Sequence, residues 1–340
     1  EDTLDLFSGG RALSENLQFD RELRLPKEEN ATVKVDSIKG ITIDEFDWEQ
    51  LLEDKDTVFD PLASSVPADQ HALFFRTFSD MLTVFDETTL RATPLLRAFE
   101  PRAESAKSKE KYELQLGLPM SELSRLLGPQ LIESVAFTSS DPFLRTGTDL
   151  AILYKAKNVK GLLAALAFRR LQVATTHPSA KVVDGEIAGI TYGGLVSPDR
   201  SICTYVAELG EQVVVVTNSL TQLEKLGHAQ EGKSPSLAQL DEYRFFRQRY
   251  VYGSAEEKAF LVVTDATLRR WCGPRWRIGA SRRTRAAAAL SELQARHLAG
   301  EKLEARNFPE LGEVSIVAGQ AQSTVYGNLR FLTPISELDV

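Results

Sequence analysis

The sequence predicts an α+β fold in which helices pack on one face of mostly antiparallel sheets. One observation is a recurring unit in which a short apolar run, typical of a strand, leads into a helical stretch. A second observation is that three apolar runs, the last of which begins one of these units, are separated only by turn-length connections. Parallel strands need longer crossovers, so these runs indicate an antiparallel meander. The recurring unit covers 71–87, 150–172, 213–226 and 259–271, and the meander covers 186–193, 201–208 and 212–217.

The recurrence also predicts two related strand–helix halves that meet near residue 230. We expect an acidic N-terminal arm over 1–60, a first α+β half over 61–230 and a second half over 231–340, either as separate units or as one continuous domain. The first residue is Glu1, and 331–335 leads toward the C-terminus without a closing turn. We therefore expect both ends to be cuts from a longer polypeptide.

The last part of the chain contains the clearest predicted helix. This is the alanine-rich stretch 281–299, with Ser281 as candidate N-cap and Gly300 just after its end. The runs 315–317 and 321–331 then predict closing strands.

Composition and charge argue against several classes of protein. The chain has 340 residues, 43% hydrophobic and 26% charged, which is ordinary for a globular protein. Its net charge of −8, from 40 basic and 48 acidic residues, argues against nucleic acid as a partner. Because no run of 18 apolar residues occurs, we expect no membrane span in this fragment.

The residue types that usually carry catalysis or bind metal are sparse. Two cysteines lie far apart and outside any Cys-x-x-Cys spacing, which argues against a zinc site and leaves open one bridge or two free thiols. The histidines show neither H-E-x-x-H nor another paired spacing, and no G-x-S-x-G elbow occurs. We therefore assign no catalytic residue, no metal ligand and no cofactor. The residues are Cys203, Cys272, His71, His177, His228 and His297.

The segment from Gly227 to Ser234 fits G-x-x-x-x-G-K-[ST], the pattern of a loop that cradles phosphates with backbone N–H groups. Its context differs from such loops, because the amphipathic stretch 220–226 separates it from the preceding strand. Pro235 also disfavours the helical conformation at Ser234, where a helix should already run. Nucleotide binding by Gly232, Lys233 and Ser234 is therefore a minor alternative, and a polar loop between helices is the favoured interpretation.

Seven arginines and no acidic residue lie between Arg269 and Arg285, interleaved with two tryptophans. Guanidinium groups bind oxyanions bidentately and indoles offer flat faces, so the segment is a candidate site for a polyanion or carbohydrate. Three of the arginines are expected in a first helical turn, where positive charge is unfavourable without an anion. The eight acidic residues of 44–60 could supply internal pairing instead. The candidate ligand-binding residues are Arg269, Arg270, Trp271, Arg275, Trp276, Arg277, Arg282 and Arg283.

With these residues in view, the chain resembles domains of unknown function found in large exported bacterial proteins. The resemblance spans roughly residues 66–290. It is carried by a Pro-Ala-Asp element leading into a strand, a strand–helix pair, a Gly-rich hairpin with a strand–helix, and a Ser-Leu-Ala element before an aromatic helix and strand. These parts are 67–75, 148–172, 189–226 and 236–265.

The resemblance implies a cell-envelope or extracellular setting and a role in assembly or binding, and it brings no catalytic residues. We therefore expect a non-enzymatic interaction or structural domain of a larger bacterial envelope-associated protein, with a protein partner. Two alternatives remain open: a polyanion- or polysaccharide-binding module using 269–285, and a nucleotide-binding protein using Lys233 and Ser234.

Overall fold

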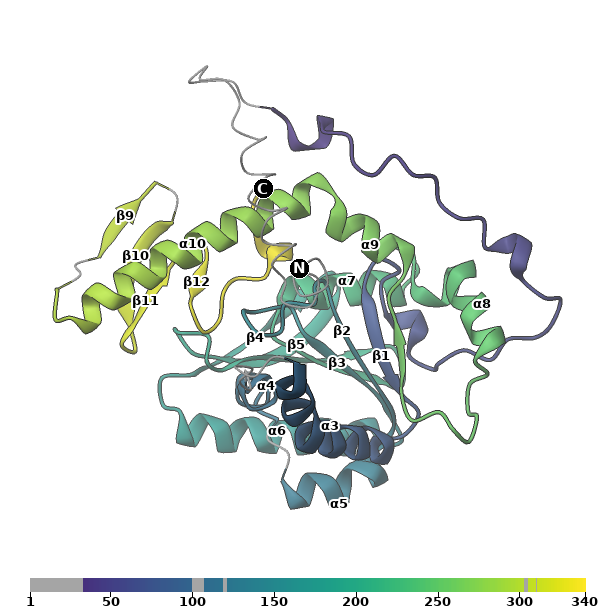
Figure 1. The fold of residues 1–340 in the computed structure, drawn as a ribbon. Helices are drawn as coiled ribbons and strands as arrows, with labels where there is room; N and C mark the ends of the chain where they lie inside the picture. Colours follow the sequence, from purple (N-terminus) through teal and green to yellow (C-terminus); the bar gives the residue numbers. More distant parts are fainter. Residues whose placement is uncertain (1–32, 100–106, 119–120, 303–304, 310) are drawn as a thin grey trace.

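A computed structural model describes residues 33–99, 107–118, 121–302, 305–309 and 311–340 (Figure 1). Its centre is an eight-stranded sheet in the order β4-β5-β6-β7-β3-β2-β1-β8, in which all neighbouring strands are antiparallel. The α+β class and the antiparallel character are thus confirmed. The strands are β1 (His71–Phe75), β2 (Ile132–Ser139), β3 (Ala151–Ala156), β4 (Lys181–Ile187), β5 (Ile190–Val196), β6 (Cys203–Leu209), β7 (Val213–Thr217) and β8 (Phe260–Val262).

Helices cover both faces of this sheet rather than one (Figure 1). The reason lies in the strands, whose alternate side chains are apolar on both faces. In β3, Leu153 joins a core cluster with Leu223 of α7, whereas Ile152 joins a second cluster with Leu162 of α6. One layer contains α3 (Phe78–Phe99), α4 (Ser108–Gln115), α5 (Glu122–Leu131) and α6 (Val159–Thr176), and the other contains α7 (Leu220–Gln230), α8 (Asp241–Arg249), α9 (Asp265–Cys272) and α10 (Pro274–Leu298).

The meander of β4 to β7 is confirmed, but its first predicted strand is a hairpin. The run 186–193 contains the end of β4 and the start of β5, joined where Ile187 pairs with Ile190. The two turn residues, Ala188 and Gly189, have φ of 50° and 82°. Positive φ at both central residues is typical of the two-residue turn that matches the twist of a hairpin.

Helix α10 begins seven residues earlier than the sequence predicts. Gly273 is its N-cap and Pro274 occupies its first turn, where the fixed φ of proline suits a helix and its missing N–H costs nothing. Ser281 is therefore inside the helix, and Arg282, Arg283 and Arg285 are not in its first turn. The predicted end is confirmed, since Gly300 follows with a φ of 90°.

A second, four-stranded sheet in the order β12-β11-β10-β9 packs against α10. Leu290 and Leu293 of the helix share a core cluster with Val314 and Ala321 of the sheet. The run 321–331 is not one strand, because a turn separates β11 from β12. The strands are β9 (Arg306–Phe308), β10 (Gly312–Val317), β11 (Gln320–Ser323) and β12 (Gly327–Asn328).

The large sheet is continuous across the expected boundary near residue 230. Strand β8, from the expected second half, pairs with β1 from the first, with Leu73 opposite Leu261. None of the helices in the described part of the chain is both long and apolar enough to cross a membrane.

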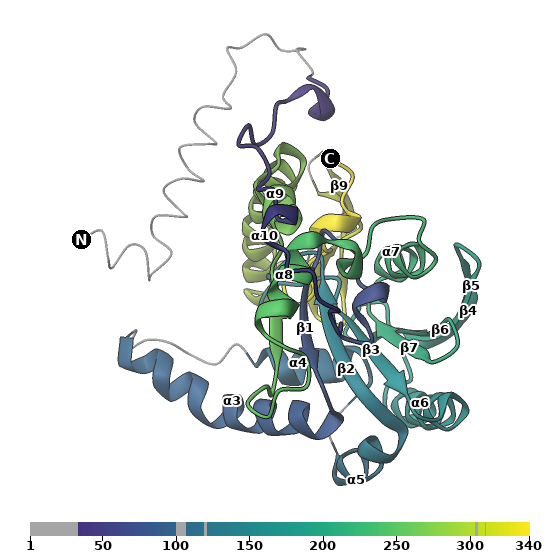
Figure 2. The ribbon, with the colours of Figure 1, turned by 90° about the vertical axis from the view of Figure 1, so that its right-hand side faces the viewer.

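The described part of the N-terminal arm lies beside α8 and α10 (Figure 2). It contains the short 3-10 helices η1 (Val35–Ser37) and η2 (Glu49–Leu51). Trp48 holds the arm in place, because its ring lies 5.3 Å from that of Phe245 and 5.4 Å from that of Phe246.

A buried ion pair joins the end of the arm to α8. Two nitrogens of Arg247, Nε and Nη2, each donate to a carboxylate oxygen of Asp60 at 2.7 Å, and Nη1 donates to Glu257 at 2.9 Å. The hydroxyl of Tyr243 also donates to Asp60. The Arg247 guanidinium lies 3.7 Å from the ring centroid of Phe260, and its side chain is 0% exposed.

We predict that Arg247→Ala lowers the free energy of unfolding by about 3–5 kcal/mol, because it leaves the Asp60 carboxylate buried without its cation. Urea denaturation measures the change. The matched control is Arg249→Ala on the same helix, where the exposed side chain should change stability by less than about 0.5 kcal/mol. Equal effects of the two substitutions would contradict this role of the ion pair.

Candidate functional site: a buried polar network beneath an arginine-rich segment

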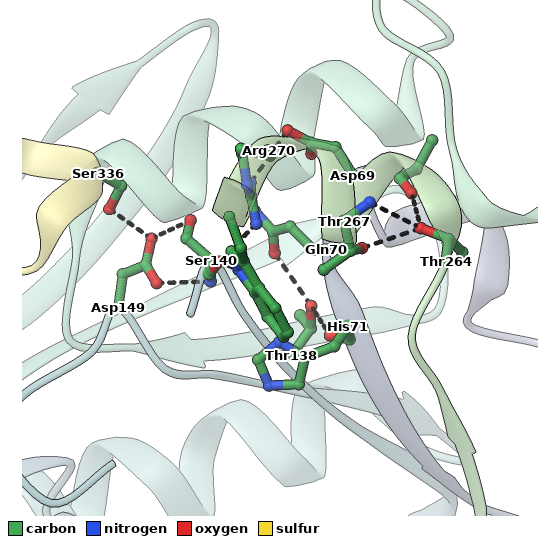
Figure 3. A network of polar contacts seen from close by, with 12 residues as sticks. Asp69, Gln70, His71, Thr138, Ser140, Asp149, Thr264, Thr267, Arg270 and Ser336 are labelled. Atoms are coloured by element: carbon green, nitrogen blue, oxygen red, sulfur yellow. Dashed lines mark hydrogen bonds and ion pairs between the residues drawn. The ribbon is translucent and has the colours of Figure 1, made fainter. Parts of the chain in front are cut away.

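A group of buried polar side chains lies at the end of the large sheet where β2 ends and β1 and β3 begin (Figure 3). Ser140 and Asp149 are at its centre, and both are completely buried. One oxygen of Asp149 accepts from the Ser140 backbone N–H at 2.7 Å, and the other accepts from the Ser140 hydroxyl at 2.5 Å. The same oxygen accepts from the hydroxyl of Ser336 at 2.6 Å, which ties the C-terminal segment to the sheet.

Two glutamines extend the network toward α7. The amide of Gln70 donates to Gln222 at 2.8 Å, and the amide of Gln222 donates back at 2.6 Å. The hydroxyl of Thr138 donates to the Gln70 side-chain oxygen at 3.0 Å. Such reciprocal bonds satisfy polar groups that would be costly to bury alone.

Helix α9 covers the network with two side chains from the arginine-rich segment. Arg270 donates to the Ser140 carbonyl at 2.5 Å and to Asp69 at 3.0 Å. The indole N–H of Trp271 donates to the same carbonyl at 2.7 Å. The Arg270 guanidinium also lies 5.2 Å from the ring of Trp276, which is buried.

A second carboxylate, Asp141, lies beside this network with one oxygen unpartnered. Its Oδ1 accepts from the Phe143 N–H at 2.8 Å, whereas Oδ2 is buried without a hydrogen bond. The charge of Arg283 favours the ionised form of Asp141, and this arginine is buried and donates to the Gly147 carbonyl at 2.9 Å. His71 Nδ1 and Arg270 Nε are also buried without a partner among the described residues.

Two of these groups have shifted pKa values. Burial, then the charge of Asp149, raises the pKa of Asp141 to about 6. Burial lowers the pKa of His71 to about 4, partly opposed by the charge of Asp149. Near neutral pH the network therefore holds a neutral imidazole and a carboxylate that is costly to ionise.

Within the described residues, no group of three or more His, Cys, Asp or Glu side chains is placed to hold a metal ion. Cys203 is buried, Cys272 is exposed, and both are free thiols, so the bridge that the sequence left open is not formed.

Arg269, the first arginine of the segment, also has partners within the protein. Arg269 donates to the Ile43 carbonyl at 2.6 Å and pairs with Asp265 and, at 3.8 Å, with Glu45 of the acidic arm. Internal pairing with the acidic arm thus occurs at Arg269. Arg270 and Arg283 instead donate to the backbone carbonyls of Ser140 and Gly147, which lie in the connection between β2 and β3.

Three arginines of α10 point outward. Arg275, Arg282 and Arg285 are exposed and have no hydrogen bond or ion pair with any residue that the structure describes. Spacings of seven and three residues place them on one side of the helix, about 15 Å from first to last at 1.5 Å per residue. Arg277 is half-buried. The structure thus divides the predicted ligand-binding residues. One group, which includes Arg269, Arg270, Trp271 and Arg283, bonds within the protein, whereas Arg275 and Arg282 face outward.

The segment that fits the phosphate-loop pattern is a helix end. Gly227 lies inside α7, where an added Cβ would come 2.1 Å from Cδ1 of Ile190, so this glycine permits close packing. The backbone N–H groups of Lys233 and Ser234 donate to the His228 carbonyl at 2.8 and 3.2 Å. These amides close a turn and are not directed at a shared anion site.

Sequence analysis missed Ser140, Asp141, Asp149 and Ser336. A signal was available only in part, because Asp149 directly precedes a predicted strand, whereas β2, the strand that ends just before Ser140 and Asp141, was not predicted. Nothing local in the sequence indicates that Ser336 reaches the same place.

The fold and this network define an α+β protein with one large antiparallel sheet and a polar cluster buried at its edge. No family model, no curated protein and no solved structure matches the chain. The resemblance to domains of exported bacterial proteins therefore remains an expectation.

We predict opposite pH effects for Asp141→Asn and His71→Gln. Between about pH 4 and 6 the folded state holds the Asp141 proton more tightly than the unfolded state, so this group costs stability as pH rises. The folded state binds a proton on His71 more weakly, so this group adds stability as pH rises. Relative to wild type, Asp141→Asn should gain about 3 kcal/mol between pH 4 and 7, and His71→Gln should lose about 3 kcal/mol.

Urea unfolding of the three proteins across this pH range measures both slopes. Curves parallel to that of the wild type would contradict the shifted pKa values, since a purely structural loss would not depend on pH.

Proposed function

We propose that this chain is a non-enzymatic interaction domain of a larger bacterial envelope-associated protein, and that it binds another protein through an apolar surface on α5 and α6. The carrying observation is the exposure of four large apolar side chains on these helices. They are Leu126 (70% exposed), Leu127 (42%), Phe168 (59%) and Leu171 (63%), and we call them the α5–α6 surface.

The two helices lie side by side and antiparallel. Near one end, an added Cβ on Gly161 of α6 would lie 3.2 Å from Leu131 of α5. Near the other end, Arg169 of α6 donates to the hydroxyl of Ser121, the N-cap of α5, at 2.9 Å. The exposed leucines and Phe168 are therefore presented by adjoining helices.

Helix α6 has an apolar side beyond the one that the sheet needs. Leu162 and Leu166 are buried against the strands, whereas Ala164, Phe168 and Leu171 form an exposed stripe at helical spacing. Contiguous exposed apolar patches on a protein surface mark sites of interaction. Burying one such large side chain contributes about 1.5–3 kcal/mol, so a partner that covers four gains several kcal/mol.

We predict that a photo-crosslinking amino acid at position 171 of the full-length protein, expressed in its own host, gives a discrete product with another protein. The same label at position 298, an exposed leucine on α10, is the matched control and should give no such product. Phe168→Glu should abolish the crosslink at 171, because burying a carboxylate in the interface is costly.

The idea fails if positions 171 and 298 give the same products, or if Phe168→Glu leaves the product unchanged. A thermal melt of Phe168→Glu, whose side chain is exposed, confirms that the domain remains folded.

The envelope setting is supported by the resemblance and is tested separately. We predict that the full-length protein fractionates with the cell envelope or the medium of its host. Recovery in the cytoplasmic fraction alone would exclude the setting while leaving the α5–α6 surface to be judged by crosslinking.

A second candidate function is binding of a polyanion or acidic polysaccharide. It is favoured by Arg275, Arg282 and Arg285, which face outward in a row without an internal partner among the described residues. Guanidinium groups spaced along a helix suit an anion that repeats along a polymer.

A further inference from the structure

We propose that a cavity of about 250 Å³ beside α10 binds a small oxyanion group such as a phosphate, a sulfate or a carboxylate. Arg282, Arg285 and Ala286 of α10 line it together with Pro309 and Tyr326 from the region of the small sheet. The inference refines the second candidate function, because it assigns the anion to one site on the row of arginines.

The two arginines that line the cavity differ from Arg283 and Arg296 of the same helix, because they have no partner among the described residues. Arg296, farther along α10, forms an ion pair with Glu301, and Arg283 is buried against backbone carbonyls. Arg282 and Arg285 pair with no described residue. Like charges three residues apart on a helix repel, so an anion between them would remove an unfavourable interaction.

Tyr326 also lines the cavity, and its hydroxyl is the third donor of the proposed site. The residue is only 8% exposed, yet its hydroxyl has no hydrogen bond with a described residue. Its backbone is held on both sides, since its N–H donates to the Ser323 hydroxyl at 2.9 Å and its carbonyl accepts from the Thr333 N–H at 2.9 Å. Hydrogen bonds on both sides thus hold the backbone of this lining residue.

The size and charge of the cavity select the class of ligand. Pockets for drug-sized molecules begin at about 300 Å³, so this cavity suits an inorganic anion or a single acidic group of a larger molecule. Two guanidinium groups can each donate two hydrogen bonds to one oxyanion, and a phenol hydroxyl can donate another.

Isothermal titration calorimetry tests the proposal with inorganic phosphate, inorganic sulfate, monomeric galacturonate and polygalacturonate. We expect wild type to bind at least one of the three small anions. Arg282→Gln and Arg285→Gln should each weaken that binding by at least about 10-fold, and Tyr326→Phe by about 5-fold, because each removes a donor to the anion. The matched control is Arg275→Gln, an exposed arginine of the same helix outside the cavity, which should change the affinity by less than about 2-fold.

Two results would overturn the cavity site: wild type binds none of the small anions, or Arg275→Gln weakens their binding as much as Arg282→Gln. If polygalacturonate still binds wild type in either case, the second candidate function survives without the cavity. If no anion of either kind binds, both ideas fail. Unchanged melting temperatures of the variants show that a lost affinity does not reflect unfolding.

Discussion

Both faces of the central strands are apolar, and the rest of the architecture depends on that constraint. Along β7, Val213 and Val215 belong to one core cluster and Val214 and Val216 to the other. A sheet that must exclude water on both sides needs a helical layer on each, and the chain supplies one before β4 and the other after β7. Because α6 is apolar on nearly every side, covering the sheet leaves part of it exposed. The same helix therefore completes the core on one side and contributes Phe168 and Leu171 to the α5–α6 surface on the other.

The edge of the sheet poses a different physical problem, since strand ends leave polar groups inside the protein. Here the Ser140 carbonyl accepts from two side chains of α9, and Asp149 accepts from the Ser140 N–H and from the hydroxyls of Ser140, Thr148 and Ser336. Satisfying these groups draws together α9, the connection after β2 and the C-terminal segment with Ser336. The unpartnered oxygen of Asp141 is the exception. Burial, then the charge of Asp149, raises the pKa of this carboxyl even though the Phe143 N–H donates to its other oxygen.

Much of the fold could be predicted because its signals are local. The predicted units 71–87 and 213–226 begin with β1 and β7 and continue into α3 and α7, as expected. Features that depend on distant contacts could not be predicted. The pairing of β1 with β8 joins strands far apart in sequence, and no local pattern indicates it. The N-cap is Gly273 rather than Ser281 because Pro274 can begin the helix two turns earlier.

The arginine-rich segment shows the same limit at the level of a site. Composition predicts a cationic region, but the helical period decides which side chains face the protein. Arg283 faces inward while its neighbours at one and two residues' distance, Arg282 and Arg285, face outward, because successive residues turn by about 100°. The inward arginines Arg270 and Arg283 donate hydrogen bonds to backbone carbonyls in the connection between β2 and β3. The outward arginines are not needed by the described fold, and for that reason they are the ones that remain able to bind an external anion.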